Sequence, residues 1–266
     1  MTRAVTTWVL LRGLAREACH WGDFPALLAA HSPHTRVVTV DLPGNGEANA
    51  SRSPADVPSI AEACRDTLRQ RGLQPPFGVI AMSLGAMVTV DWAHRHPHEL
   101  ARAVLINTSL RPFSPFHQRL RPSAWAPLLT AALSRDPLRR EQAVWQLTSH
   151  RPPQDREAIV ASWARLSRER PVQLSNALRQ LLAAARYRAP ATPPRVPMLL
   201  LCSARDGLVH PACSRAVAHG WTLALETHPW AGHDLPLDDP AWVVGQVVGS
   251  PALKPLQADG PAACPA

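Results

Sequence analysis

Lysine is almost absent from this sequence of 266 residues: Lys254 is the only one, and arginine supplies the other positive charges, for a formal net charge of +8. The excess lies in one segment, because residues 111–195 hold 15 arginines against five acidic residues, while the remainder holds 13 basic and 15 acidic ones. No recognition motif or aromatic-interleaved basic stretch accompanies this charge, so a nucleic-acid partner is not expected. The arginines either attract an anionic substrate or form a solvated polar face.

Long hydrophobic runs are also missing. No apolar stretch approaches the roughly 18 to 20 residues of a membrane-spanning helix, so no membrane span is expected. Residues 1–12 lack the apolar length and the small-residue cleavage site of a secretory signal, which predicts a cytoplasmic protein. The five cysteines are odd in number and have neither CxxC nor Cys/His spacing, which argues against a disulfide framework and a zinc site. We expect free thiols, no metal and no cofactor.

Short apolar runs alternate with helical patterns in the first 110 residues. Each run is nearly continuous in apolar character, as in strands of a parallel sheet that is covered on both faces. The predicted strands are Thr7–Leu11, Arg36–Val40, Phe77–Ala81 and Ala103–Ile106. The helical patterns between them are Trp21–Ala30, Pro58–Arg71 and Leu84–His96. This alternation predicts a doubly wound α/β fold.

The alternation stops after residue 110, where prolines punctuate helical patterns and no strand is predicted. The predicted helices of this insertion are Ser123–Leu133, Arg139–Thr148, Asp155–Arg168 and Val172–Arg188. Afterwards the predicted elements are strands at Val196–Cys202 and Thr222–Thr227 and a helix at Pro240–Val248. We therefore expect a core of residues 1–110 and 191–249, a helical insertion over 111–190, and a flexible tail over 250–266.

Ser83 stands between two small residues, Ala81 and Gly85, after a predicted strand and before a predicted helix. This is the setting of a nucleophile elbow, in which a strained backbone projects the hydroxyl from the sheet edge and neighbouring side chains must be small. Taken alone the motif is weak, because a serine that caps a helix N-terminus has the same pattern.

Asp206 and His233 each follow a later predicted strand. Asp206 lies in a turn with Gly207, and His233 lies in the loop before the last helix. Alone, the first is an ordinary Asp-Gly turn and the second a solvated histidine. With Ser83 they occur in the order Ser, Asp, His, each just beyond the carboxyl end of a strand, where open α/β sheets place their chemistry. Together they predict a catalytic triad. The neighbouring aspartates are expected at the surface and at the cap of the last helix: Asp234, Asp238 and Asp239.

With these motifs the chain resembles the α/β-hydrolase superfamily from its first strand to about Val248. Two further segments look like parts of that family: Val38–Gly46 is similar to the turn before the elbow, and Leu10–Leu14 is similar to the oxyanion loop. Two residues depart from the pattern, because Ala81 replaces the first glycine of the elbow and Arg12 replaces a common histidine.

The resemblance implies a mostly parallel sheet of about six strands, with the insertion as a helical cap over the site. It also implies an oxyanion hole formed by the backbone N–H groups of Leu14 and Leu84. The pocket would then be lined by Arg12 and Met82 from the core and by three tryptophans of the cap, Trp125, Trp145 and Trp163. Alternatively, the tryptophans pack the cap helices together.

The implied function is a serine hydrolase that cleaves a carboxylic ester through an acyl-enzyme. A thioesterase or acyltransferase would use the same triad, and the arginine-rich segment would suit thioesters of coenzyme A or of a carrier protein. A catalytically inactive relative that binds a ligand stays open because of Arg12 and Ala81. The sequence carries no signal of oligomeric state.

Overall fold

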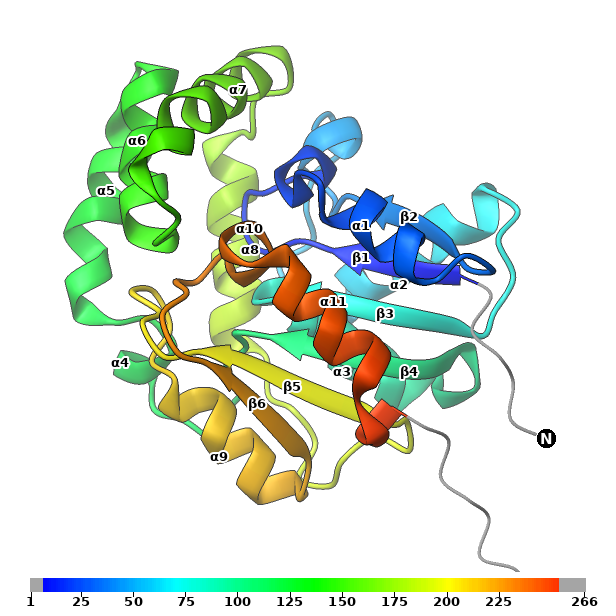
Figure 1. Ribbon diagram of the computed structural model, residues 1–266. Coiled ribbons are helices and arrows are strands. Elements are labelled where there is room, and N and C mark those ends of the chain that lie inside the picture. Colours follow the sequence, from blue (N-terminus) through cyan, green and yellow to red (C-terminus); the bar gives the residue numbers. More distant parts are fainter. Residues whose placement is uncertain (1–6, 254–266) are drawn as a thin grey trace, which may run out of the picture.

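The computed structural model describes residues 7–253, and its centre is one six-stranded sheet in which all paired strands run parallel (Figure 1). The strand order is β2-β1-β3-β4-β5-β6. The strands are β1 (Thr7–Leu11), β2 (Arg36–Val40), β3 (Phe77–Met82), β4 (Leu100–Ile106), β5 (Met198–Ser203) and β6 (Ala224–His228). The predicted fold class, a parallel sheet of about six strands, is confirmed.

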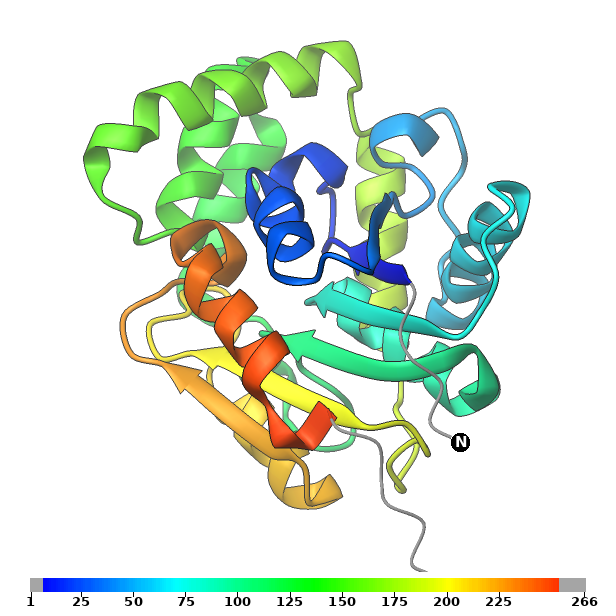
Figure 2. The same ribbon diagram turned by 45° about the vertical axis from the view of Figure 1, so that its right-hand side comes forward.

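Each central strand is buried on both sides, because helices cover both faces of the sheet (Figure 2). Alternate residues of β1 enter different apolar clusters: Val9 and Leu11 pack on one face, Trp8 and Leu10 on the other. The first face is covered by α2 (Val57–Gln70), α3 (Leu84–Arg95) and α9 (Ala212–Trp221). The second is covered by α1 (Phe24–His31) and α11 (Pro240–Gly249). This two-sided burial explains why the strands are continuous apolar runs in the sequence.

The segment between β4 and β5 is helical and lies beyond the carboxyl ends of the strands (Figure 1). Its helices are α4 (Phe116–Arg119), α5 (Trp125–Leu133), α6 (Pro137–Thr148), α7 (Arg156–Glu169) and α8 (Leu174–Arg186). Helix α6 packs against both α5 and α7. Within residues 7–253, no helix is long and apolar enough to cross a membrane.

Polar side chains of helix α8 bind loops of the core. Asn176 donates to the carbonyl oxygen of Ser51 and accepts the N–H of Ser53, at 3.0 and 2.9 Å. Gln180 is fully buried and donates to the carbonyl oxygen of Pro43 at 3.0 Å. The helix therefore joins the insertion to the sheet rather than standing apart from it.

Most of the tail predicted as flexible, residues 254–266, lies outside the described residues. Pro251–Leu253 form a short 3-10 helix, and the side chain of Leu253 is buried in the cluster of α1 and α11. Leu253 therefore contributes to the apolar core, within the segment that the sequence predicts as a loose tail.

The core packing predicts a large cost for Leu105→Ala, since Leu105 is fully buried in β4. We expect a loss of about 2–5 kcal/mol in the free energy of unfolding, measured by urea denaturation. The matched control is Leu133→Ala on α5, where the side chain is 70% exposed. It should change stability by less than about 0.5 kcal/mol. Equal losses in both variants would contradict the assignment of the core.

Candidate functional site

Ser83 is the residue at which β3 ends and α3 begins, and its backbone has φ 50° and ψ −113°. This strained conformation is uncommon outside glycine. The turn is also tightly packed: a Cβ on Gly85 would lie 2.6 Å from the carbonyl oxygen of Arg12. Ala81, in contrast, is fully buried in the apolar cluster beside α3, which accommodates its methyl group. The geometry is that of a nucleophile elbow.

His233 is held by Asp206, as the sequence predicts. The Nδ1 atom of His233 lies 2.7 Å from Oδ2 of Asp206, and both residues are buried. The other carboxylate oxygen of Asp206 accepts the N–H groups of Leu208 and Val209 at 2.8 and 2.9 Å. With both oxygens bound, the carboxylate has a fixed orientation and can stabilise a positive charge on the imidazole.

Asn107 also positions His233, and sequence reasoning missed it. It follows β4, has φ 47°, and is buried. Its amide nitrogen donates to the carbonyl oxygen of His233 at 2.8 Å, and its amide oxygen accepts the N–H of Ser203 at 2.8 Å. The only local signal is an asparagine after a strand, a residue type that tolerates positive φ.

Asp234 and Asp238 were expected at the surface, and this expectation is wrong, because both are buried. Asp238 accepts the N–H groups of Gly232 and His150 at 2.7 and 3.0 Å, which joins the loop of His233 to the end of α6. Burial raises the pKa of Asp238, although these donors oppose the shift. Asp239 does cap α11, since its side chain accepts the N–H of Trp242 at 2.9 Å.

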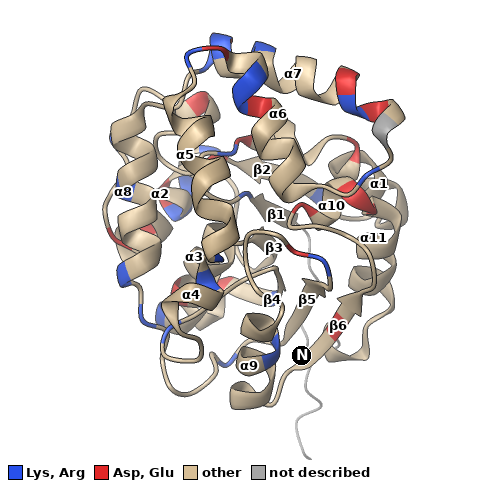
Figure 3. Cartoon of the chain, turned by 90° about the vertical axis from the view of Figure 1, so that its left-hand side faces the viewer, with Lys and Arg blue, Asp and Glu red and all other residues tan. Residues whose placement is uncertain are grey.

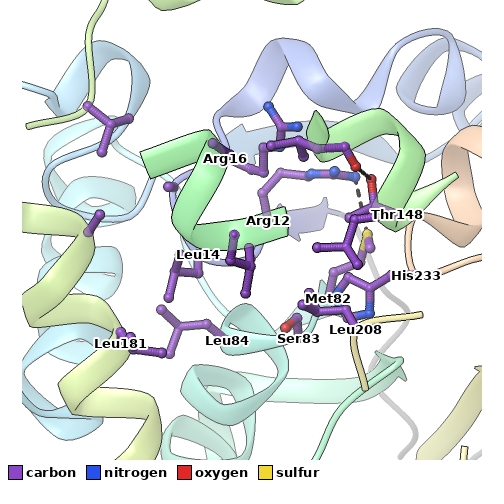
Figure 4. Close-up of a pocket in the computed structure, with 18 of the residues that line it drawn as sticks. Arg12, Leu14, Arg16, Met82, Ser83, Leu84, Thr148, Leu181, Leu208 and His233 are labelled. Carbon is purple, nitrogen blue, oxygen red and sulfur yellow. Dashed lines mark hydrogen bonds between the residues drawn. The ribbon is translucent and has the colours of Figure 1, made fainter. Parts of the chain in front are cut away.

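Ser83 and His233 both line one cavity of about 500 Å³ (Figure 4). Within residues 7–253, the structure has no hydrogen bond between the Ser83 hydroxyl and the imidazole. Such bonds are often long in hydrolases without substrate and tighten in the complex. The structure thus brings the three predicted residues to one place, with the Asp–His bond formed and the Ser–His bond open.

Leu14 and Leu84 lie on the same side of this cavity as Ser83 (Figure 4). Within residues 7–253, neither backbone N–H has a hydrogen-bond partner. The loop of Leu14 passes close to the elbow, because a Cβ on Gly13 would lie 3.2 Å from Cβ of Ser83. The N–H of Leu84 begins α3, where the helix dipole favours negative charge. Two free donors beside Ser83 are suited to bind an oxyanion.

The predicted pocket residues divide into two groups. Arg12, Met82 and Trp163 line the cavity, but Trp125 and Trp145 do not, and for these two the prediction is corrected. Trp145 packs against Trp163, with ring centroids 5.8 Å apart, and so belongs to the interior of the insertion. Trp125 is 49% exposed, and its ring packs against Phe116, with centroids 6.2 Å apart.

His20 is a buried titratable group in the cavity wall that sequence reasoning did not single out. The N–H of Glu17 donates to its Nδ1 at 3.1 Å, and Nη1 of Arg16 lies 2.9 Å from its Nε2. Its ring lies 5.4 Å from that of Trp163. Burial, together with the positive charges of Arg16 and Arg12, holds the pKa of His20 well below its ordinary value of 6.5.

Comparison with known proteins adds a family and several relatives. The model of the alpha/beta hydrolase family matches residues 8–246. The pimeloyl-[acyl-carrier protein] methyl ester esterase of Aromatoleum aromaticum is 33% identical over 213 residues, covering 74% of this chain and 81% of that protein. The enol-lactonase of Burkholderia xenovorans LB400 has a TM-score of 0.75 at 19% identity, covering 93% and 91% of the two chains. The esterase RhEst1 of a Rhodococcus species has a TM-score of 0.68 at 22% identity, covering 92% and 91%. The two solved structures show the shared fold.

The low pKa of His20 predicts destabilisation by acid. In the unfolded chain the imidazole binds a proton as the pH falls through about 6.5, whereas the folded protein leaves it neutral. Because the unfolded state then binds more protons, the free energy of unfolding falls by up to about 1.4 kcal/mol per pH unit below that value. Urea unfolding at about pH 7.5 and about pH 5.5 should show a larger loss for the wild type than for His20→Gln. Equal losses would contradict a neutral buried His20.

Proposed function

The chain belongs to the alpha/beta hydrolase family, and we propose that this hydrolase cleaves a carboxylic ester through an acyl-enzyme formed on Ser83. One observation carries the proposal: His233, which lines the same cavity as Ser83, is joined to Asp206 by a 2.7 Å hydrogen bond. The esterase of Aromatoleum aromaticum supports the reaction class.

In the proposed reaction, His233 takes the proton of the Ser83 hydroxyl as the oxygen attacks the ester carbonyl carbon. The carbonyl oxygen gains the negative charge and is stabilised by the N–H groups of Leu14 and Leu84. The tetrahedral intermediate then expels the alcohol, which receives the proton from His233. Water repeats the two steps on the acyl-enzyme and releases the acid, while Asp206 stabilises the imidazolium.

The cavity supports an apolar acyl group as the larger part of the substrate. Its wall includes Leu128 of α5 and Leu178 and Leu181 of α8, and α5 contains no charged residue (Figure 3). Exposed side chains continue this apolar wall outward, since Leu178 is 56% and Leu181 41% exposed. We therefore propose an ester whose acyl chain lies between α5 and α8.

The relative's name specifies a methyl ester on a pimeloyl group bound to acyl-carrier protein. By analogy we propose that the alcohol part is small and that the acyl chain ends in an anionic carrier. The 15 arginines within residues 111–195 would attract such a carrier.

The same arginines favour the second candidate, a thioesterase or acyltransferase that attacks the carrier thioester itself. A non-catalytic binding protein is disfavoured, because Ala81 fits its strand.

Ser83→Ala tests the nucleophile. We expect kcat for p-nitrophenyl esters to fall by about 10⁶-fold, because no other hydroxyl occupies the elbow. A fluorophosphonate probe should label the wild type and not this variant. Ser109→Ala is the matched control, since Ser109 lines the same cavity, and it should keep the label. Labelling of Ser83→Ala at the wild-type rate would refute the assignment.

A panel of p-nitrophenyl esters and acyl thioesters separates the two candidate reactions. The dependence of kcat/KM on salt concentration tests the role of the arginines. We expect alkyl esters to be cleaved with higher kcat/KM than thioesters of the same acyl chain. For an ester with a terminal carboxylate, kcat/KM should fall by about tenfold between low and high salt, because screening weakens electrostatic attraction. A neutral ester of equal length is the control. Equal salt dependence of both esters would contradict a steering role of the arginines.

A further inference from the structure

Arg12, which stands where the family commonly has a histidine, forms a buried ion pair with Asp234. Its Nη1 and Nη2 atoms donate to Oδ1 and Oδ2 at 2.9 and 2.6 Å. Both side chains are only 4% exposed. The pair is bidentate, an arrangement that fixes the relative orientation of its two members as well as their distance.

The guanidinium of Arg12 also contacts two further residues at the site. It lies over the ring of Trp21, 5.0 Å from the centroid, and its Nη1 is 3.1 Å from Sδ of Met82. Met82 immediately precedes Ser83, and Asp234 immediately follows His233. Arg12 itself is two residues before Leu14 in the candidate oxyanion loop. One side chain therefore touches the neighbours of the candidate nucleophile and base (Figure 4).

Stability alone does not account for this pair. Desolvating two charges costs about as much as their attraction returns, and well-packed apolar residues in their place are often equally stable. What the pair supplies is a connection between two loops. The loop of His233 is also restrained by Asp206, Asn107, Asp238 and the carbonyl oxygen of Thr148, and none of these belongs to the oxyanion loop.

We propose that the Arg12–Asp234 pair is a positioning device that sets the oxyanion loop against the loop of His233. The inference rests on the proposed function, in which the N–H of Leu14 and the imidazole of His233 act on the same intermediate. An error of about 1 Å in such an arrangement costs about 100-fold in rate. Arg12 and Asp234 are positioning residues, since neither touches the reacting atoms.

The test is a double-mutant cycle of Arg12→Met, Asp234→Leu and the double variant, measured for kcat, KM and urea midpoint. We expect the double variant to keep a urea midpoint near that of the wild type. Its kcat should fall by about 100-fold while KM changes by less than about threefold.

A double variant with wild-type stability and wild-type kcat would overturn the proposal. If the apolar variants do not fold, Arg12→Lys is measured in their place, because lysine keeps the positive charge but loses the bidentate geometry. It should fold and lose kcat; an unchanged kcat would contradict positioning. Fluorophosphonate labelling of the wild type is measured first. If the wild type is not labelled, the proposed function is refuted. If the wild type and the variants are labelled at equal rates, only the role of the Arg12–Asp234 pair is refuted.

Discussion

The hydrogen bond between Asp206 and His233 depends on a constraint of the whole sheet, namely that parallel strands end at one edge. Asp206 follows β5 and His233 follows β6, which are neighbours. Ser83 follows β3 at the same edge, and Asn107 follows β4 between them. Residues that are more than 100 positions apart thereby reach one cavity, and no local interaction could bring them together.

The candidate oxyanion loop is held by contacts on both sides. On one side Arg12 binds Asp234 of the core, and on the other the N–H of Ala15 donates to Gln180 of α8 at 2.9 Å. Ala15 has φ 53°, a strained conformation that persists only where the surroundings enforce it. The loop that presents the N–H of Leu14 is therefore fixed by contacts to two distant parts of the chain.

The strands and the fold class could be predicted from the sequence because two-sided burial leaves a local signature of continuous apolar residues. Ser83, Asp206 and His233 could be predicted because their order and strand context are visible along the chain. The roles of Asp234 and Asp238 could not be predicted in this way, since a charged residue in a loop is usually solvated and the partner of Asp234 is 222 positions away. Similarly, periodicity identifies α5 as a helix without showing that Leu128 lines the cavity and Trp125 does not.

The contact of Asp238 with the end of α6 limits how the insertion can move. Gly232 has no room for a side chain there, since a Cβ would lie 2.6 Å from the carbonyl oxygen of Thr148. A movement of the insertion at this point would therefore displace the loop of His233 and change the position of the imidazole. Within residues 7–253, the parts of the cavity wall on α5 and α8, which include Leu128 and Leu178, form no hydrogen bond to that loop, so a rearrangement there would not be transmitted to His233 in this way.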